Sequence, residues 1–111
     1  MAFIIQESVD DLLVAIFAEP ETDVSPERDF KHDPSVARSI RRKMKTNMLA
    51  WCSIGVTVFR VGETVDWHAP HTQHLGCCSY KSFQDFVEGG YYTQMRDEAI
   101  EEYRRNLKAT E

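Results

Sequence analysis

Hydrophobic residues recur along the chain with two different periods, and each period predicts one type of secondary structure. Within residues 8–18, apolar side chains follow the i, i+3, i+4, i+7, i+8 pattern of a helix that buries one face. Ser8 and Asp11 resemble a capping box at its start, and Pro20 is placed to end it. The spacing therefore predicts a first helix over about 8–18.

The next segment, 19–33, is acidic, contains prolines and has few apolar residues, so it predicts an exposed loop. Asp33 and Pro34 are typical of an N-cap and a first helical position, and they predict a second helix over about 34–48. Its apolar residues occupy one arc of the helix, and an adjacent arc is basic. The basic arc consists of Arg38, Arg41, Arg42 and Lys45.

The period changes after the second helix. Residues 51–61 are rich in β-branched side chains, with apolar residues on both faces, which favours a central, covered strand. Gly62 and Glu63 mark a turn, and Val65 then alternates with Trp67. The pattern predicts a small antiparallel hairpin or three-stranded sheet over about 51–68, with Trp67 pointing into the core.

Helical spacing returns in the last third of the chain. It predicts a helix over about 80–88, stopped by Gly89 and Gly90, and an amphipathic helix over about 91–108. With 111 residues, the chain has the length of a single globular domain. The predicted fold class is α+β, with the small sheet packed by about four helices and the acidic loop 19–33 outside.

Charge is segregated along this chain. The net charge is −5, yet residues 34–60 hold six bases and no acid, whereas acids predominate on both sides. Such a basic segment either folds back onto the acidic ones or presents one positive face on a negative body.

Composition and cysteine content indicate the class of protein and its redox environment. Hydrophobic residues make up 42% and charged residues 28%, which is typical of a soluble globular protein. No apolar run is long enough to span a bilayer, and no basic and apolar leader precedes the domain. Three cysteines, two of them adjacent, favour free thiols in a reducing cytoplasm over a disulfide framework.

Histidines and cysteines cluster within the segment 66–78. Its donors recur every three residues, and imidazole with thiolate is the ligand pair that zinc prefers. The candidate metal ligands are His68, His71, His74 and Cys77. Their spacing matches no standard zinc motif, so a polar surface loop is the alternative. A cysteine nucleophile beside a histidine would need an oxyanion hole and an orienting partner, and neither is legible, so no catalytic residue is assigned.

The basic arc is the second candidate site. Its cations could dock an acidic protein surface or follow a phosphate backbone, although a pI near 5.3 is low for a nucleic-acid module. Tyr91 and Tyr92 follow two glycines and are candidate interface anchors. The leading hypothesis is therefore a small non-enzymatic binding or regulatory protein that acts through a protein partner. Zinc binding and nucleic-acid binding are the alternatives.

Overall fold

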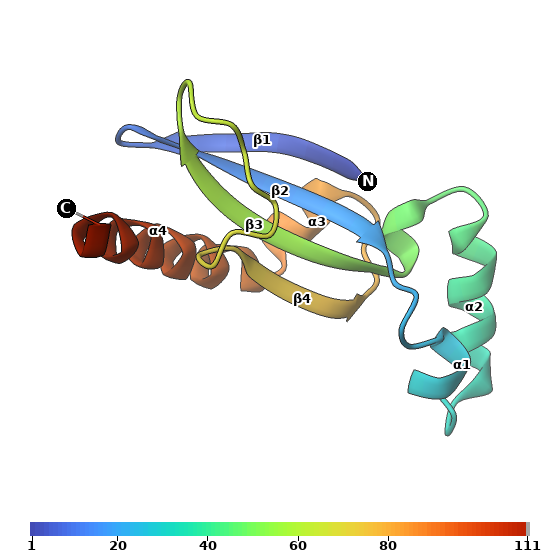
Figure 1. The fold of residues 1–111 in the computed structure, drawn as a ribbon. Coiled ribbons are helices and arrows are strands. Elements are labelled where there is room, and N and C mark those ends of the chain that lie inside the picture. Colours follow the sequence, from blue (N-terminus) through green and yellow to red (C-terminus); the bar gives the residue numbers. More distant parts are fainter. Residues whose placement is uncertain (111) are drawn as a thin grey trace.

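The computed structural model describes residues 1–110 and is of the α+β class, with a four-stranded antiparallel sheet whose one face is covered by the C-terminal helix (Figure 1). The strands lie side by side in chain order. The elements are β1 Ala2–Val9, β2 Leu12–Pro20, α1 Pro26–Asp29, α2 Pro34–Met44, the short 3-10 helix η1 Met48–Ala50, β3 Cys52–Arg60, β4 Gln73–Cys78, α3 Phe83–Glu88 and α4 Tyr91–Thr110.

The N-terminal segment is a hairpin, so the helix predicted over 8–18 is wrong. β1 and β2 pair from Ala2 with Ala18 to Val9 with Leu12. Between them Asp10 adopts a positive φ of 55°, a conformation that Asp tolerates in tight turns. β2 is buried on both faces, and its unbroken apolar run satisfies helical spacing as well as strand geometry.

β3 is a central strand, as the apolar residues on both its faces predict. It pairs with β2 along its whole length and with β4 over its first half. Val14 and Val56 are fully buried and belong to the same cluster as Ala99 and Tyr103 of α4. The core therefore lies between the sheet and α4, which runs beside the sheet in Figure 1.

The strand that returns after β3 is not the one predicted. The turn is present, because Glu63 N–H donates to the Arg60 carbonyl at 3.0 Å. The chain then leaves the sheet as a loop, residues 61–72, and pairs only at β4. Trp67 packs in that loop against Phe17 and Phe3, with ring centroids 4.9 and 5.1 Å apart. Its partners come from the N-terminal hairpin, which local alternation cannot reveal.

The helices after residue 33 are those predicted, with shifted ends. α2 ends at Met44, and η1 follows where the helix was expected to continue to 48. The segment 19–33, expected as a loop, contains α1. Asn47 ties this region to the body, because its Nδ2 donates to the Tyr80 carbonyl at 3.0 Å.

Within the described chain, no helix combines the length and apolar character that crossing a membrane requires.

Candidate functional site

Helices α1 and α2 form a lobe at one end of the sheet, well apart from the C-terminal end of α4 (Figure 1). We call residues 25–45 the α1–α2 lobe. Each helix starts on a local signal: Ser25 Oγ accepts the backbone N–H of Arg28 at 3.1 Å, and Pro26 and Pro34 occupy the first turns. The basic arc of the sequence thus lies on a separate projection of the molecule.

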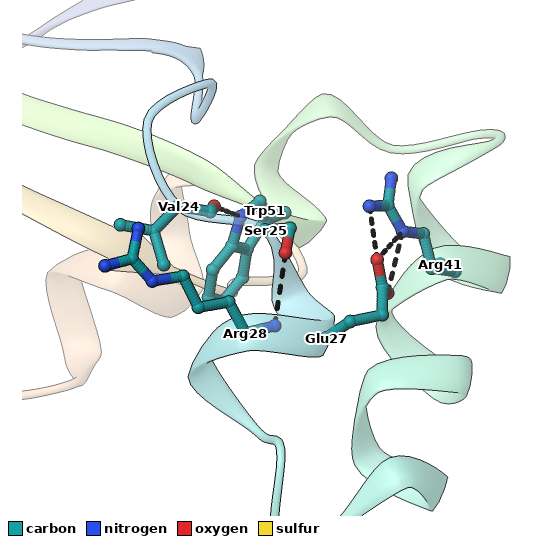
Figure 2. A network of polar contacts seen from close by, with 6 residues as sticks. All are labelled: Val24, Ser25, Glu27, Arg28, Arg41 and Trp51. Atoms are coloured by element: carbon teal, nitrogen blue, oxygen red, sulfur yellow. Dashed lines mark hydrogen bonds and ion pairs between the residues drawn. The ribbon is translucent and has the colours of Figure 1, made fainter.

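Trp51 fastens the lobe to the body. It precedes β3, is only 2% exposed, and its indole Nε1 donates to the Val24 carbonyl at 2.8 Å (Figure 2). Its ring also meets Phe30 at 6.2 Å between centroids, in an edge-on arrangement. A buried tryptophan with a satisfied N–H provides both apolar area and direction, so this contact sets how the lobe is held.

A groove of about 820 Å³ opens on the lobe. Its apolar lining residues come from α2 and from the connection between the two helices, and most of the other lining residues are charged. Its lining consists of Glu27, Phe30, Lys31, Pro34, Ser35, Ala37, Arg38, Arg41 and Arg42. Cations in such a lining can pair with acidic groups, and apolar side chains can pack against apolar ones.

One ion pair spans the groove lining. The Arg41 guanidinium meets the Glu27 carboxylate through Nε at 2.9 Å and Nη2 at 2.5 Å, a bidentate arrangement that Figure 2 shows. Hydrogen bonding by Arg41 lowers the pKa of the Glu27 carboxyl from its ordinary value. The pair is exposed, so it orients α1 against α2 more than it stabilises the fold.

The other predicted cations are differently placed. Arg38 and Arg42 line the groove, are exposed, and take part in none of the ion pairs found within residues 1–110. Lys45 is also exposed but lies at the end of α2, outside the lining. Of the four cations in the basic arc, Arg41 is therefore paired with Glu27, and Lys45 lies outside the groove. The other two, Arg38 and Arg42, line the groove without an ion pair to any of the described residues.

The two tyrosines predicted as interface anchors separate. Tyr91 is 56% exposed at the start of α4, whereas Tyr92 is buried in the core. The Tyr92 hydroxyl donates to Glu7 Oε2 at 2.6 Å, and burial, followed by this hydrogen bond, raises its pKa. Tyr92 thus joins β1 to α4, and neither tyrosine lines the groove.

The four predicted metal ligands do not form one cluster. His68 and His74 stack at 6.3 Å between centroids, while His71 contacts Tyr103 at 5.1 Å and its Nε2 lies 2.8 Å from the Val58 carbonyl. The Cys77 thiol is 3.7 Å from Glu21. Within residues 1–110 no three His, Cys, Asp or Glu side chains gather closely enough to hold a metal ion.

Two of the three cysteines are buried, and the third, Cys77, is partly buried. Cys52 and Cys78 are opposite each other on β3 and β4, and both are buried. Burial raises the pKa of Cys52 to about 12 and that of Cys78 to about 11. Burial also raises the pKa of Cys77, and the nearby Glu21 carboxylate adds to the effect. A nucleophilic cysteine needs the opposite shift.

Sequence reasoning missed the part of the groove that lies in the segment 19–33. Glu27, Phe30 and Lys31 were assigned to an exposed loop, yet they face α2 across the groove. The signal was present: Ser25 with Pro26 repeats the N-cap and proline pattern that located the start of α2 at Asp33 and Pro34. A short helix starting at Pro26 brings the apolar Phe30 next to α2.

Comparison of the chain with protein-family models, with curated proteins and with solved structures gave no match. The geometry and chemistry of the groove are therefore the basis for a functional assignment. The groove lining combines cations and apolar side chains, and the lining residues include no histidine and no cysteine.

Proposed function

We propose that this protein is a small binding module that docks an acidic, amphipathic segment of a protein partner in the groove of the α1–α2 lobe. The observation that carries the proposal is the presence of exposed, unengaged Arg38 and Arg42 beside the apolar Phe30 and Ala37 in one groove. Partner carboxylates would meet the arginines, and apolar partner side chains would cover the floor.

The apolar part of the lining favours a protein over a nucleic acid. Phosphate backbones are bound by cations together with polar groups and give a salt-dependent, sequence-independent affinity. An apolar floor adds nothing to phosphate contacts, whereas it can bury a leucine or phenylalanine side chain of a peptide. Arg41 contributes by orienting α1 against α2, because its guanidinium is already paired with the Glu27 carboxylate.

A matched pair of charge reversals tests the proposal. The probe is a fluorescent peptide that alternates Glu with Leu, followed by anisotropy, with poly-Glu and a DNA duplex as competitors. Arg38→Glu/Arg42→Glu should weaken peptide binding at least about tenfold, which corresponds to roughly 1.4 kcal/mol. Lys43→Glu/Lys45→Glu makes the same charge change on α2 outside the groove and should have a much smaller effect.

The competitors decide between the partner classes. Poly-Glu lacks the apolar side chains and should compete poorly if the groove floor is used. Equal losses in the two double variants, or stronger binding of the DNA duplex than of the peptide, would contradict the proposal and favour general polyanion binding. Circular dichroism of each variant should show the fold unchanged, because exposed substitutions usually alter stability by about 0.5 kcal/mol or less.

A further inference from the structure

The two edges of the sheet are built differently. In the described chain β1 pairs only with β2, so the outer side of β1 is an edge with backbone donors and acceptors turned outward. β4 forms the other edge. Unprotected edges tend to pair with another strand, and natural proteins usually interrupt or charge them.

The β4 edge is interrupted in several ways. The strand covers only the first half of β3, and its register shifts between the pairings of Cys52 and Ile54. Cys77 within it has a positive φ of 55°, and its N–H is taken by Glu21 Oε1 at 3.0 Å. Beyond β4, His71 Nε2 occupies the Val58 carbonyl on β3. This edge offers no straight run for a further strand.

The β1 edge has no such protection over its first half. Ala2 to Ile5 pair with β2 in regular register, and the irregularity comes only after Ile5. In the described part of the chain, the most exposed large hydrophobic side chains include Met1 at 56%, Phe3 at 54% and Ile5 at 49%. Phe3 and Ile5 are on the sheet face opposite α4, because side chains alternate along a strand and Ile4 between them packs against the core.

Charge does not oppose pairing of this edge with itself. The segment from Ala2 to Gln6 has no charged residue. The first carboxylate, Glu7, is already held within its own chain, by the Tyr92 hydroxyl at 2.6 Å and by Arg96 at 3.2 Å. Two copies can therefore approach along β1 without placing unpaired like charges opposite each other.

We propose that a second copy of this chain docks on the β1 edge, with the two β1 strands antiparallel, so that two four-stranded sheets become one continuous sheet. The pairing places Phe3 of one copy opposite an odd-numbered residue of the other, Phe3 or Ile5, because only that parity keeps the exposed apolar face on one side. The contact is self-complementary, and the interrupted β4 edge prevents further growth, so assembly stops at a dimer.

The test is the mass of the purified protein measured by light scattering over a wide range of concentrations. The wild type should change from the mass of one chain to that of two as concentration rises. Ile5→Lys places a cation on the outer face of the strand and should keep the protein monomeric over that range. Val61→Lys is the matched control, because Val61 is 77% exposed but lies outside β1, and it should dimerise like the wild type.

Hydrogen exchange on the wild type supplies a second measurement that needs no substitution. The amides within residues 2–5 that point away from β2 should gain protection with concentration, while those of β4 should not. A wild type that stays monomeric at the highest concentration, an Ile5→Lys variant that still dimerises, or large polydisperse species in place of a dimer would each overturn the proposal. Because the groove lies on the lobe, peptide binding is expected to persist in the monomeric variant.

Discussion

The α1–α2 lobe and the sheet body are stabilised by different interactions. In the body, side chains such as Ile16, Ile54 and Val56 are fully buried between the sheet and α4. In α2 only Ala37 and Ile40 are buried, and the lobe adds an exposed ion pair and the contact with Trp51. Apolar burial is worth far more than an exposed ion pair, so the lobe should open locally before the body unfolds.

A charge in the body should have the largest effect. Val58 is 1% exposed and belongs to the core cluster beneath α4. Val58→Asp should cost more than about 4 kcal/mol, because it buries an unpaired carboxylate, and most of the protein should become insoluble. Soluble yield and urea denaturation measure this. Val61→Asp, at an exposed position three residues later, should melt like the wild type. A cooperatively folded Val58→Asp protein would show that the sheet body tolerates a charge at this buried position, and the contrast with the lobe would fail.

Loosening the joint between the two regions should have an intermediate effect. Trp51→Phe removes the N–H that reaches the Val24 carbonyl and should cost about 1–3 kcal/mol. Hydrogen exchange should accelerate in residues 22–45 far more than in β2 and β3. Trp67→Phe changes a tryptophan that packs on the body and should leave exchange in the lobe unaltered. Uniform acceleration in both regions after Trp51→Phe would mean that lobe and body unfold as one unit.

The smallest effect concerns the ion pair within the lobe. The folded pKa of Glu27 is lowered by Arg41, so its stabilising contribution is present above the ordinary carboxyl pKa and is lost as pH falls through the lowered value. Exchange in α1 should therefore quicken on acidification at pH values where the body remains protected. Glu27→Gln should remove most of this pH dependence, while Glu88→Gln, at the end of α3, should retain it.

Much of the secondary structure follows from local patterns. Asp33 with Pro34 predicts the start of α2, β-branched alternation predicts β3, and the pair Gly89 and Gly90 separates α3 from α4. The error at 8–18 has a physical cause, since a strand buried on both faces carries the same unbroken apolar run as a buried helix. Only pairing with β1 and β3 distinguishes the two.

The sequence by itself determined the α+β class, the central and covered position of β3, and the basic arc of α2, because these depend on residues close together in the chain. The tertiary structure alone decided which of those cations face a groove, because Phe30 and Glu27 reach α2 only through folding. It also decided where the histidines lie, since His71 contacts the Val58 carbonyl while His68 stacks on His74. The sequence spacing shows which residue types could act together. The distances between their side chains depend on how the rest of the protein packs around them.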